Sequence, residues 1–162
     1  MNYKIYDNLL TKEENKTIYD MVTDWNFNWH LKMNLNDYQT DNDKSVYFTH
    51  SFYYEGQGAS KNFPTMKPLL DKIGHNYLIR MVGNLYTNTT KIIKHAKHTD
   101  FDVQHTVCLY YINTNNGKTI LNDEVEIDSI ANRLLVFDGD IPHCSTTCTD
   151  EKVRLNVNVN VR

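Results

Sequence analysis

A mainly β fold of the α+β class is predicted, in which helices from the N-terminal part of the chain support a barrel formed by the rest. Apolar residues recur at helical spacing only before residue 78. From there on, short runs of strand-forming residues alternate with turn residues at roughly eight to twelve positions. Helices packed outside many short strands are typical of a double-stranded β-helix, or jelly-roll barrel. We expect that architecture in a single domain over residues 1–162, with a helical region at 1–77 and the barrel core at 78–162.

Two helices are expected before the barrel. The first covers about residues 11–25, because Thr11 and Glu14 have the spacing of a capping box. The second runs from Pro64 or Thr65 to Tyr77. The apolar residues at helical spacing are Ile18, Met21, Val22 and Trp25 in the first helix and Leu69, Leu70 and Ile73 in the second. Residues 45–54, between the helices, are expected to be extended.

The strands expected in the barrel are short runs bounded by turn residues. They cover residues 79–88, 91–97, 105–113, 118–121, 124–128, 133–138, 142–147 and 152–161. The last run alternates strictly. Its apolar face carries Leu155, Val157, Val159 and Val161, and its polar face carries Arg154, Asn156, Asn158 and Asn160. The polar face lies either in water or, if the strand belongs to a barrel, toward an internal cavity. In the second case the apolar face packs against the helices.

Three candidate metal ligands occur in the barrel region: His98, Asp100 and His143. His98 and Asp100 are two positions apart, so on an extended segment their side chains leave the same face. His143 follows a strand and a turn rich in Gly and Asp, which suits a ligand from a neighbouring strand. Two imidazoles and one carboxylate can hold one face of a ferrous ion and leave the other positions free for a co-substrate and O2. An isolated His-x-Asp pair is a weak signal, but the ordered set followed by Arg154 is far more specific.

These residues resemble the Fe(II)- and 2-oxoglutarate-dependent dioxygenases, within them the prolyl-4-hydroxylase-like branch, which includes small phage-encoded members. The resemblance covers roughly residues 78–162 and extends more loosely upstream. It implies that His98, Asp100 and His143 bind Fe(II). It also implies that Arg154 grips the far carboxylate of 2-oxoglutarate, which a guanidinium can do with two parallel hydrogen bonds.

Other segments resemble the same family. Residues 108–113 are similar to the strand after the first two ligands, which gives Tyr111 a hydrogen bond to the same carboxylate. Asn84 and Tyr86 lie in a segment similar to the strand before His-x-Asp and are expected to face the pocket. Residues 132–139 resemble the segment that leads to the second histidine.

The chain also departs from the family pattern. At residues 116–119, where many relatives have a turn with paired glycines, only Gly117 and Thr119 match. The interval between the second and third ligands is short, which implies trimmed loops. A nucleic-acid-demethylating branch shares Asn-x-Tyr, His-x-Asp and Arg-x-Asn, which adds Asn156 to the co-substrate residues, but its second arginine would fall at Asn160 and is absent.

Composition narrows the partners. A chain of 162 residues with 40% apolar content can bury the core of one ordinary domain. The net charge of −3 argues against a broad basic face for nucleic acid, so a nucleic-acid partner is not expected. No long apolar run and no signal-like N-terminus are visible, so we expect no membrane partner and a cytoplasmic location, in the host cell if the protein is phage-encoded. The oligomeric state stays open.

The three cysteines are expected to be reduced thiols. Cys108 lies in an apolar strand, and Cys144 and Cys148 flank a short polar stretch. A zinc site at this pair is the alternative, but structural zinc normally uses two closely spaced pairs, and the sequence has no second one. A reducing surrounding would also help to keep iron ferrous.

The resemblance implies an enzyme that uses Fe(II), 2-oxoglutarate and O2, with ascorbate as an additional reductant, to hydroxylate an aliphatic C–H bond. A peptidyl prolyl residue is the favoured acceptor, and a free small molecule or a nucleic-acid alkyl group is the alternative. A non-catalytic barrel that binds a sugar or peptide is the rival of another class. A cupin-type enzyme with another metal is disfavoured by Arg154 on the last strand.

The N-terminal region is expected to lie on the substrate side of the barrel. Its aromatic residues are expected mainly to fill the core, and the alternative is that they cradle a proline-containing peptide. They are Trp25, Phe27, Trp29, Tyr38, Tyr47, Phe48, Phe52, Tyr53 and Tyr54. Residues 55–60 are either a mobile lid or a plain surface connection. Of the remaining histidines, His95 and His105 are expected near the site, outside the ligand set.

Overall fold

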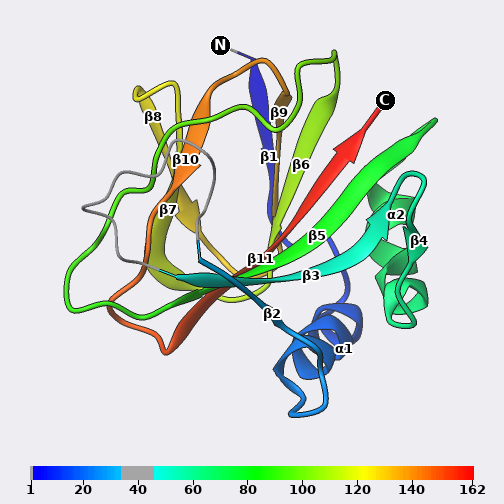
Figure 1. Ribbon diagram of the computed structural model, residues 1–162, viewed down its shortest axis with the longest axis horizontal. Helices are drawn as coiled ribbons and strands as arrows, with labels where there is room; N and C mark the ends of the chain where they lie inside the picture. Colours follow the sequence, from blue (N-terminus) through cyan, green and yellow to red (C-terminus); the bar gives the residue numbers. More distant parts are fainter. Residues whose placement is uncertain (1, 34–45) are drawn as a thin grey trace.

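The computed structural model describes residues 2–33 and 46–162 and contains two antiparallel sheets (Figure 1). The larger sheet consists of β1 (Tyr3–Tyr6), β2 (His30–Lys32), β3 (Tyr47–Tyr54), β4 (Gly58–Ala59), β5 (Leu78–Thr87), β6 (Thr106–Tyr111), β9 (Arg133–Asp138) and β11 (Val153–Val161). Its order is β1-β9-β6-β11-β5-β3-β2, with β4 paired to β3. The smaller sheet consists of β7 (Asn115–Leu121), β8 (Val125–Ser129) and β10 (His143–Ser145), in the order β10-β7-β8. The predicted mainly β, jelly-roll class is confirmed.

The first helix, α1 (Lys12–Thr23), starts as the sequence predicts. Thr11 Oγ1 accepts the backbone N–H of Glu14 at 3.2 Å, and the Glu14 carboxylate accepts the N–H of Thr11 at 2.9 Å. The capping box therefore satisfies two donors that a helix start leaves without partners. The helix ends at Thr23, slightly before the predicted boundary.

The second helix is shorter than predicted. It consists of a 3-10 turn, η1 (Phe63–Met66), followed by α2 (Lys67–Ile73). Pro68 has no N–H to donate to Pro64, and the carbonyl of Pro64 instead accepts the N–H of Lys67 in the tighter 3-10 pattern. Gly74, at φ +62°, ends the helix in the left-handed region, so the predicted continuation to Tyr77 is wrong.

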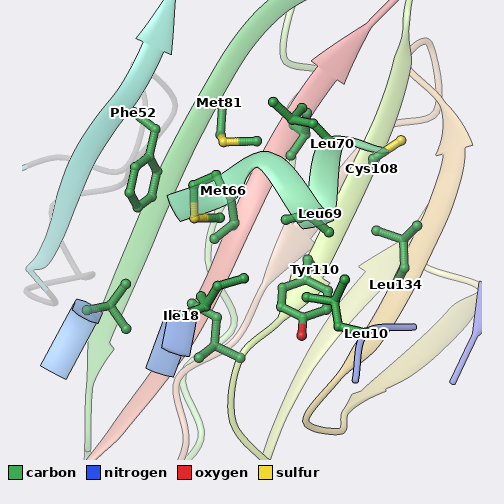
Figure 2. Packing of buried hydrophobic residues seen from close by; sticks show 14 of the residues in the cluster. Leu10, Ile18, Phe52, Met66, Leu69, Leu70, Met81, Cys108, Tyr110 and Leu134 are labelled. Atoms are coloured by element: carbon green, nitrogen blue, oxygen red, sulfur yellow. The ribbon is translucent and has the colours of Figure 1, made fainter. Parts of the chain in front are cut away.

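The main hydrophobic core lies between the helices and the larger sheet. Figure 2 shows Ile18, Met66, Leu69 and Tyr110 gathered in this cluster. The apolar face of β11, formed by Leu155, Val157, Val159 and Val161, belongs to the same cluster, as predicted. Full burial of each such side chain stabilises the fold by about 1.5 to 3 kcal/mol, which fixes the face that β11 turns to the helices.

The opposite face of the larger sheet looks toward the smaller sheet. A second cluster there includes Val107, Leu109 and Tyr111 of β6 together with Leu121 and Phe137. The polar face of β11 is on this side, and Arg154, Asn156 and Asn160 are at most 1% exposed. The polar half of the alternating strand therefore faces the interior of the barrel, the second of the two alternatives that its sequence allowed.

Some predicted elements differ in the structure. Residues 91–97 are not a continuous strand: an isolated bridge joins Lys94 to Thr146. The N–H of Ile93 donates to the hydroxyl of Thr147 at 2.9 Å, and this side-chain acceptor takes the place of a ladder carbonyl. Residues 116–119 are not a free turn either, because they lie inside β7, where the pairing with β8 shifts register between Asn115 and Lys118.

The N-terminal region supplies strands as well as helices, since β1 to β4 all belong to the larger sheet. The strands β1, β2 and β4 are too short to produce a periodic signal, and the sequence did not predict them. The predicted extended segment at 45–54 corresponds to β3 from Tyr47 onward; residue 46 precedes the strand, and residue 45 lies outside the described residues. Within the described parts of the chain, neither helix has the length and apolar character required to cross a membrane.

Candidate metal centre

His98, Asp100 and His143 converge on one point. His98 and Asp100 lie in the connection from β5 to β6, and His143 begins β10. The backbone N–H of each histidine donates to the carbonyl of the other, at 3.0 and 2.9 Å, which locks the two segments side by side. Asp100 Oδ1 lies 3.6 Å from His98 Nε2 and 4.0 Å from His143 Nε2. Two atoms bonded to one ion at about 2.1 Å each lie about 3 to 4 Å apart, so this set fits a single transition-metal ion.

The ionisation states also suit a metal. Burial by itself would raise the pKa of Asp100, but His98, Arg80 and His143 outweigh burial and hold that pKa well below its usual value. Burial lowers the pKa of His143, which favours the neutral imidazole. The Nδ1 atom of His143 faces the carbonyl of Ile141 at 3.2 Å, which directs Nε2 toward the other ligands. A carboxylate and neutral imidazoles are the forms that bind divalent metal ions.

Asp100 has further partners that sequence reasoning missed. Its Oδ1 pairs with Arg80 Nη2 at 3.1 Å, and its Oδ2 accepts the side-chain amides of Asn158 and Asn160, each at 2.8 Å. Arg80 lies opposite Asn160 in the pairing of β5 with β11. In the demethylating branch the second arginine would stand at Asn160 on β11. Here a guanidinium reaches the site from the neighbouring strand, β5. The signal for it was the alternation of β5, where Arg80 falls on the same face as Asn84.

Arg154 is fully buried, with its guanidinium 5.2 Å from the ring centre of Tyr86. It donates to Ser129 Oγ at 2.8 Å, to Thr119 Oγ1 at 3.0 Å and to the carbonyl of Thr146 at 3.4 Å. Every one of these acceptors is neutral. Among the described residues no carboxylate forms an ion pair with Arg154, so a buried positive charge is available for an anion from outside the chain.

Tyr111 lies beside this guanidinium and shares an acceptor with it. Its hydroxyl donates to Thr119 Oγ1 at 2.8 Å, and burial raises the pKa of Tyr111 to about 12, so the phenol keeps its proton.

Gly117 explains how Arg154 fits. A Cβ atom at Gly117 would lie 2.6 Å from Arg154 Cδ and 2.9 Å from the carbonyl of Thr147. Gly117, one of the two residues at 116–119 that match the family pattern, therefore leaves the space that the Arg154 side chain occupies.

The other expected co-substrate residues line the same interior. Asn84 donates its side-chain amide to Asn156 Oδ1 at 2.9 Å, which joins β5 to β11 across the polar face. The ring of Tyr86 stacks on Tyr47 at 5.5 Å and on His95 at 5.4 Å. His95 therefore lies next to the site, as expected.

Two cavities meet at the metal-ligand set. An inner cavity of about 40 Å³ extends from His98 and His143 to Arg154. An outer cleft of about 500 Å³ has His98 and Asp100 in its wall. The two share Asn84, Tyr86, His98 and Asn158 in their walls. Most other side chains of the outer cleft are polar or aromatic, namely Lys32, Tyr47, Thr49, Ser51, Tyr54, Arg80 and Thr99.

Other sequence expectations have mixed outcomes. His105 is buried and packs against Phe101, with ring centres 5.4 Å apart. Cys144 and Cys148 are buried free thiols, and in the described ranges neither belongs to the group of potential metal ligands. Of the N-terminal aromatics, Phe27 and Phe52 are buried in the core and Trp29 packs against it, whereas Trp25 is 89% exposed. Tyr38 lies outside the described residues, and the alternatives for residues 55–60 stay open.

Solved structures with a similar fold include prolyl hydroxylases and other 2OG-Fe(II) oxygenases. A prolyl hydroxylase from Trichoplax adhaerens, in complex with a hypoxia-inducible-factor peptide, is similar with a TM-score of 0.68 at 18% identity, over 98% of this chain and 82% of that chain. A 2OG-Fe(II) oxygenase from Burkholderia pseudomallei gives 0.69 at 8% identity, over 98% and 84%. The viral collagen prolyl hydroxylase of Paramecium bursaria Chlorella virus-1, in complex with 2-oxoglutarate, gives 0.58 at 12% identity, over 100% and 97%.

At the level of sequence, no protein family and no curated protein matches the chain. The likeness is therefore one of fold.

Proposed function

We propose that this chain, which has the fold of the 2-oxoglutarate- and Fe(II)-dependent oxygenases, is itself such an oxygenase and hydroxylates an aliphatic C–H bond. One observation carries the proposal: a His-Asp-His set has its ligand atoms within 4.8 Å of one another, and its two histidines line the same cavity as a buried guanidinium with neutral partners. A non-catalytic binding barrel needs no such combination.

Each residue has a part in this proposal. His98, Asp100 and His143 hold Fe(II), and Arg154 binds the far carboxylate of 2-oxoglutarate. The hydroxyl of Tyr111 has one proton, so on binding it exchanges its hydrogen bond to Thr119 Oγ1 for one to the same carboxylate. Asn84, Tyr86 and Asn156 form the wall along which the co-substrate lies. When bound, Fe(II) and 2-oxoglutarate supply activation of O2, coupled to conversion of 2-oxoglutarate to succinate and carbon dioxide. Ascorbate serves as a reductant that keeps the iron ferrous.

The outer cleft is the proposed substrate site, because His98 and Asp100 line it whereas Arg154 lines the inner cavity. We propose a peptidyl prolyl residue as the acceptor. The tyrosine rings of the cleft offer flat apolar surface to a pyrrolidine ring, and its open shape admits an extended peptide. A free small molecule is the second candidate, and the cationic side chains of Lys32 and Arg80 in the cleft favour one that carries an acidic group. The net charge of −3 counts against nucleic acid.

The test is turnover of 2-oxoglutarate to succinate by protein loaded with Fe(II) without oxygen and then exposed to air. Uncoupled turnover does not require the acceptor, so the assay applies before the substrate is known. The wild type should form succinate, and His143→Ala should not. If the wild type binds neither Fe(II) nor 2-oxoglutarate below about 1 mM, the upper end of ordinary KM values, the proposal is wrong.

The acceptor requires a second assay. A panel of proline-containing peptides and small carboxylic acids is incubated with the active enzyme, and products are detected as a gain of one oxygen in mass. A gain confined to peptides supports the prolyl acceptor. A gain confined to small acids replaces it with the second candidate.

A further inference from the structure

The surroundings of Asp100 differ from those of the two histidines. Asp100 accepts hydrogen bonds from two strands of the larger sheet, from Arg80 on β5 and from Asn158 and Asn160 on β11, and within the described ranges neither histidine side chain is held in this way. Its side chain is 5% exposed. A carboxylate has two oxygens and can accept about four hydrogen bonds or metal bonds in all, so each of these positions can be assigned to a partner.

Three of these positions are taken by the protein. Oδ2 accepts two amide donors at 2.8 Å, one from Asn158 and one from Asn160, which fills both of its lone pairs. Oδ1 accepts Arg80 Nη2 at 3.1 Å. The position that remains is on Oδ1, the oxygen that lies 3.6 Å from His98 Nε2 and 4.0 Å from His143 Nε2.

The donors are themselves oriented. Arg80 Nε donates to Asn160 Oδ1 at 3.0 Å, so the amide of Asn160 has to turn its NH2 group toward Asp100. The guanidinium of Arg80 is held from another side by the ring of Phe101, 4.7 Å away. In Asn158 the NH2 group reaches Asp100, while the buried Oδ1 has no hydrogen-bond partner among the residues that the structure describes. This orientation favours the carboxylate at the expense of the amide's own oxygen.

We propose that Arg80, Asn158 and Asn160 form a cradle that restricts Asp100 to binding the metal through one oxygen, Oδ1. The proposal rests on the metal site of the proposed function and assigns these three as positioning residues. With one donor atom from each of three ligands, an octahedral ion keeps three positions for ligands from solution. A carboxylate that bound through both oxygens would occupy one of these positions and compete with a chelating co-substrate.

Co²⁺ is the probe, because its visible spectrum reports coordination number and geometry. Asn158→Ala, Asn160→Ala and the double variant free Oδ2, and each is loaded with Co²⁺ without oxygen and titrated with 2-oxoglutarate. We expect the spectrum of bound Co²⁺ to change and the Kd of 2-oxoglutarate to rise by about ten-fold or more, as for other groups that orient metal ligands. The control is Asn88→Ala, an exposed asparagine whose amide donates to the carbonyl of Glu151.

Substitutions at Arg80 distinguish the effect of its positive charge from the effect of its hydrogen-bond geometry. Arg80→Gln removes the charge. Arg80→Lys keeps the charge but replaces the planar fork, in which Nε donates to Asn160 and Nη2 to Asp100, with a single ammonium nitrogen. We expect both variants to show the altered Co²⁺ spectrum. Arg162→Gln, in which an exposed guanidinium that donates to the carbonyl of Gln104 is lost, should match the wild type. A wild-type spectrum for Arg80→Lys would show that charge alone matters and would overturn the part assigned to Arg80.

A structural role alone would lower thermal stability or Co²⁺ affinity and leave the spectrum of the bound ion unchanged. The thermal midpoint of each metal-free variant is therefore measured alongside, and Asn158→Ala, at the half-buried position, serves if Asn160→Ala does not fold. The cradle is refuted if every variant that folds keeps the wild-type spectrum and a Kd for 2-oxoglutarate within two-fold. A wild type that binds no Co²⁺ refutes the metal site itself, which is a different result.

Discussion

Replacing Arg154 with methionine tests the central feature of the proposed co-substrate site. The guanidinium is 0% exposed and donates to two hydroxyls and one carbonyl, all neutral. Transferring the guanidinium from water to the protein interior on folding costs several kcal/mol. Each hydrogen bond from a charged donor stabilises the folded state by about 1.5 to 3 kcal/mol. These terms nearly cancel, so we expect Arg154→Met to change the stability of the ligand-free protein by less than about 2 kcal/mol.

The same substitution should have a large effect on 2-oxoglutarate binding. Removing one partner of a buried charge pair costs about 2 to 5 kcal/mol. At about 1.4 kcal/mol for each factor of ten, the Kd of 2-oxoglutarate should rise about 30-fold to 4000-fold. Arg154 thus acts on the ligand far more than on the fold.

The assay is thermal unfolding of Co²⁺-loaded protein with and without 2-oxoglutarate, without oxygen. A ligand at 100 times its Kd stabilises the folded state by about 2.7 kcal/mol. For a chain of this size that amounts to a rise of about 5 to 11 °C in the Tm of the wild type. Arg154→Met at the same concentration should show a rise of at most about 3 °C, and the exposed control Arg162→Met should match the wild type. The reasoning is refuted if Arg154→Met binds 2-oxoglutarate within five-fold of the wild type, or if the ligand-free variant loses more than about 4 kcal/mol of stability.

Gly117→Ala places a Cβ 2.6 Å from Arg154 Cδ, so overpacking should cost about 1 to 3 kcal/mol in denaturant unfolding and the Kd of 2-oxoglutarate should rise with it. Unchanged binding would mean that Arg154 does not need its present position. Thr119→Val keeps the shape but removes the oxygen that accepts from Arg154 and Tyr111 at 3.0 and 2.8 Å, and should cost about 1 to 3 kcal/mol by the same measurement. His50 is buried, and burial lowers its pKa below the ordinary value of 6.5. Its contribution to stability is therefore complete above pH 6.5 and is lost as pH falls through the lower folded pKa, with a slope of at most about 1.4 kcal/mol per pH unit. Urea unfolding between pH 7.5 and 5 should show a shallower loss in His50→Gln than in the wild type, and equal slopes would contradict this assignment.

Much of the fold was predictable because its signals are local. The capping box at Thr11 places the start of α1, since both of its hydrogen bonds lie within one turn. The alternation after Arg154 places β11 and its two faces, since side chains on a strand alternate whatever the strand pairs with. Residues 91–97 and the end of the second helix were misjudged because a hydroxyl from Thr147 and the left-handed backbone of Gly74 replace the expected pattern.

By itself, then, the sequence determined which residue types are available for the metal and the co-substrate, and the order in which they follow one another. Only the tertiary structure decided that the polar face of β11 turns inward, that the partners of Arg154 in the described part of the chain are all neutral, and that Arg80 reaches Asp100. The pairing of β5 with β11 joins Arg80 to Asn160, 80 positions away in the sequence. Strand register is a property of the whole sheet, set by the burial of both its faces, and no local pattern in the chain encodes it.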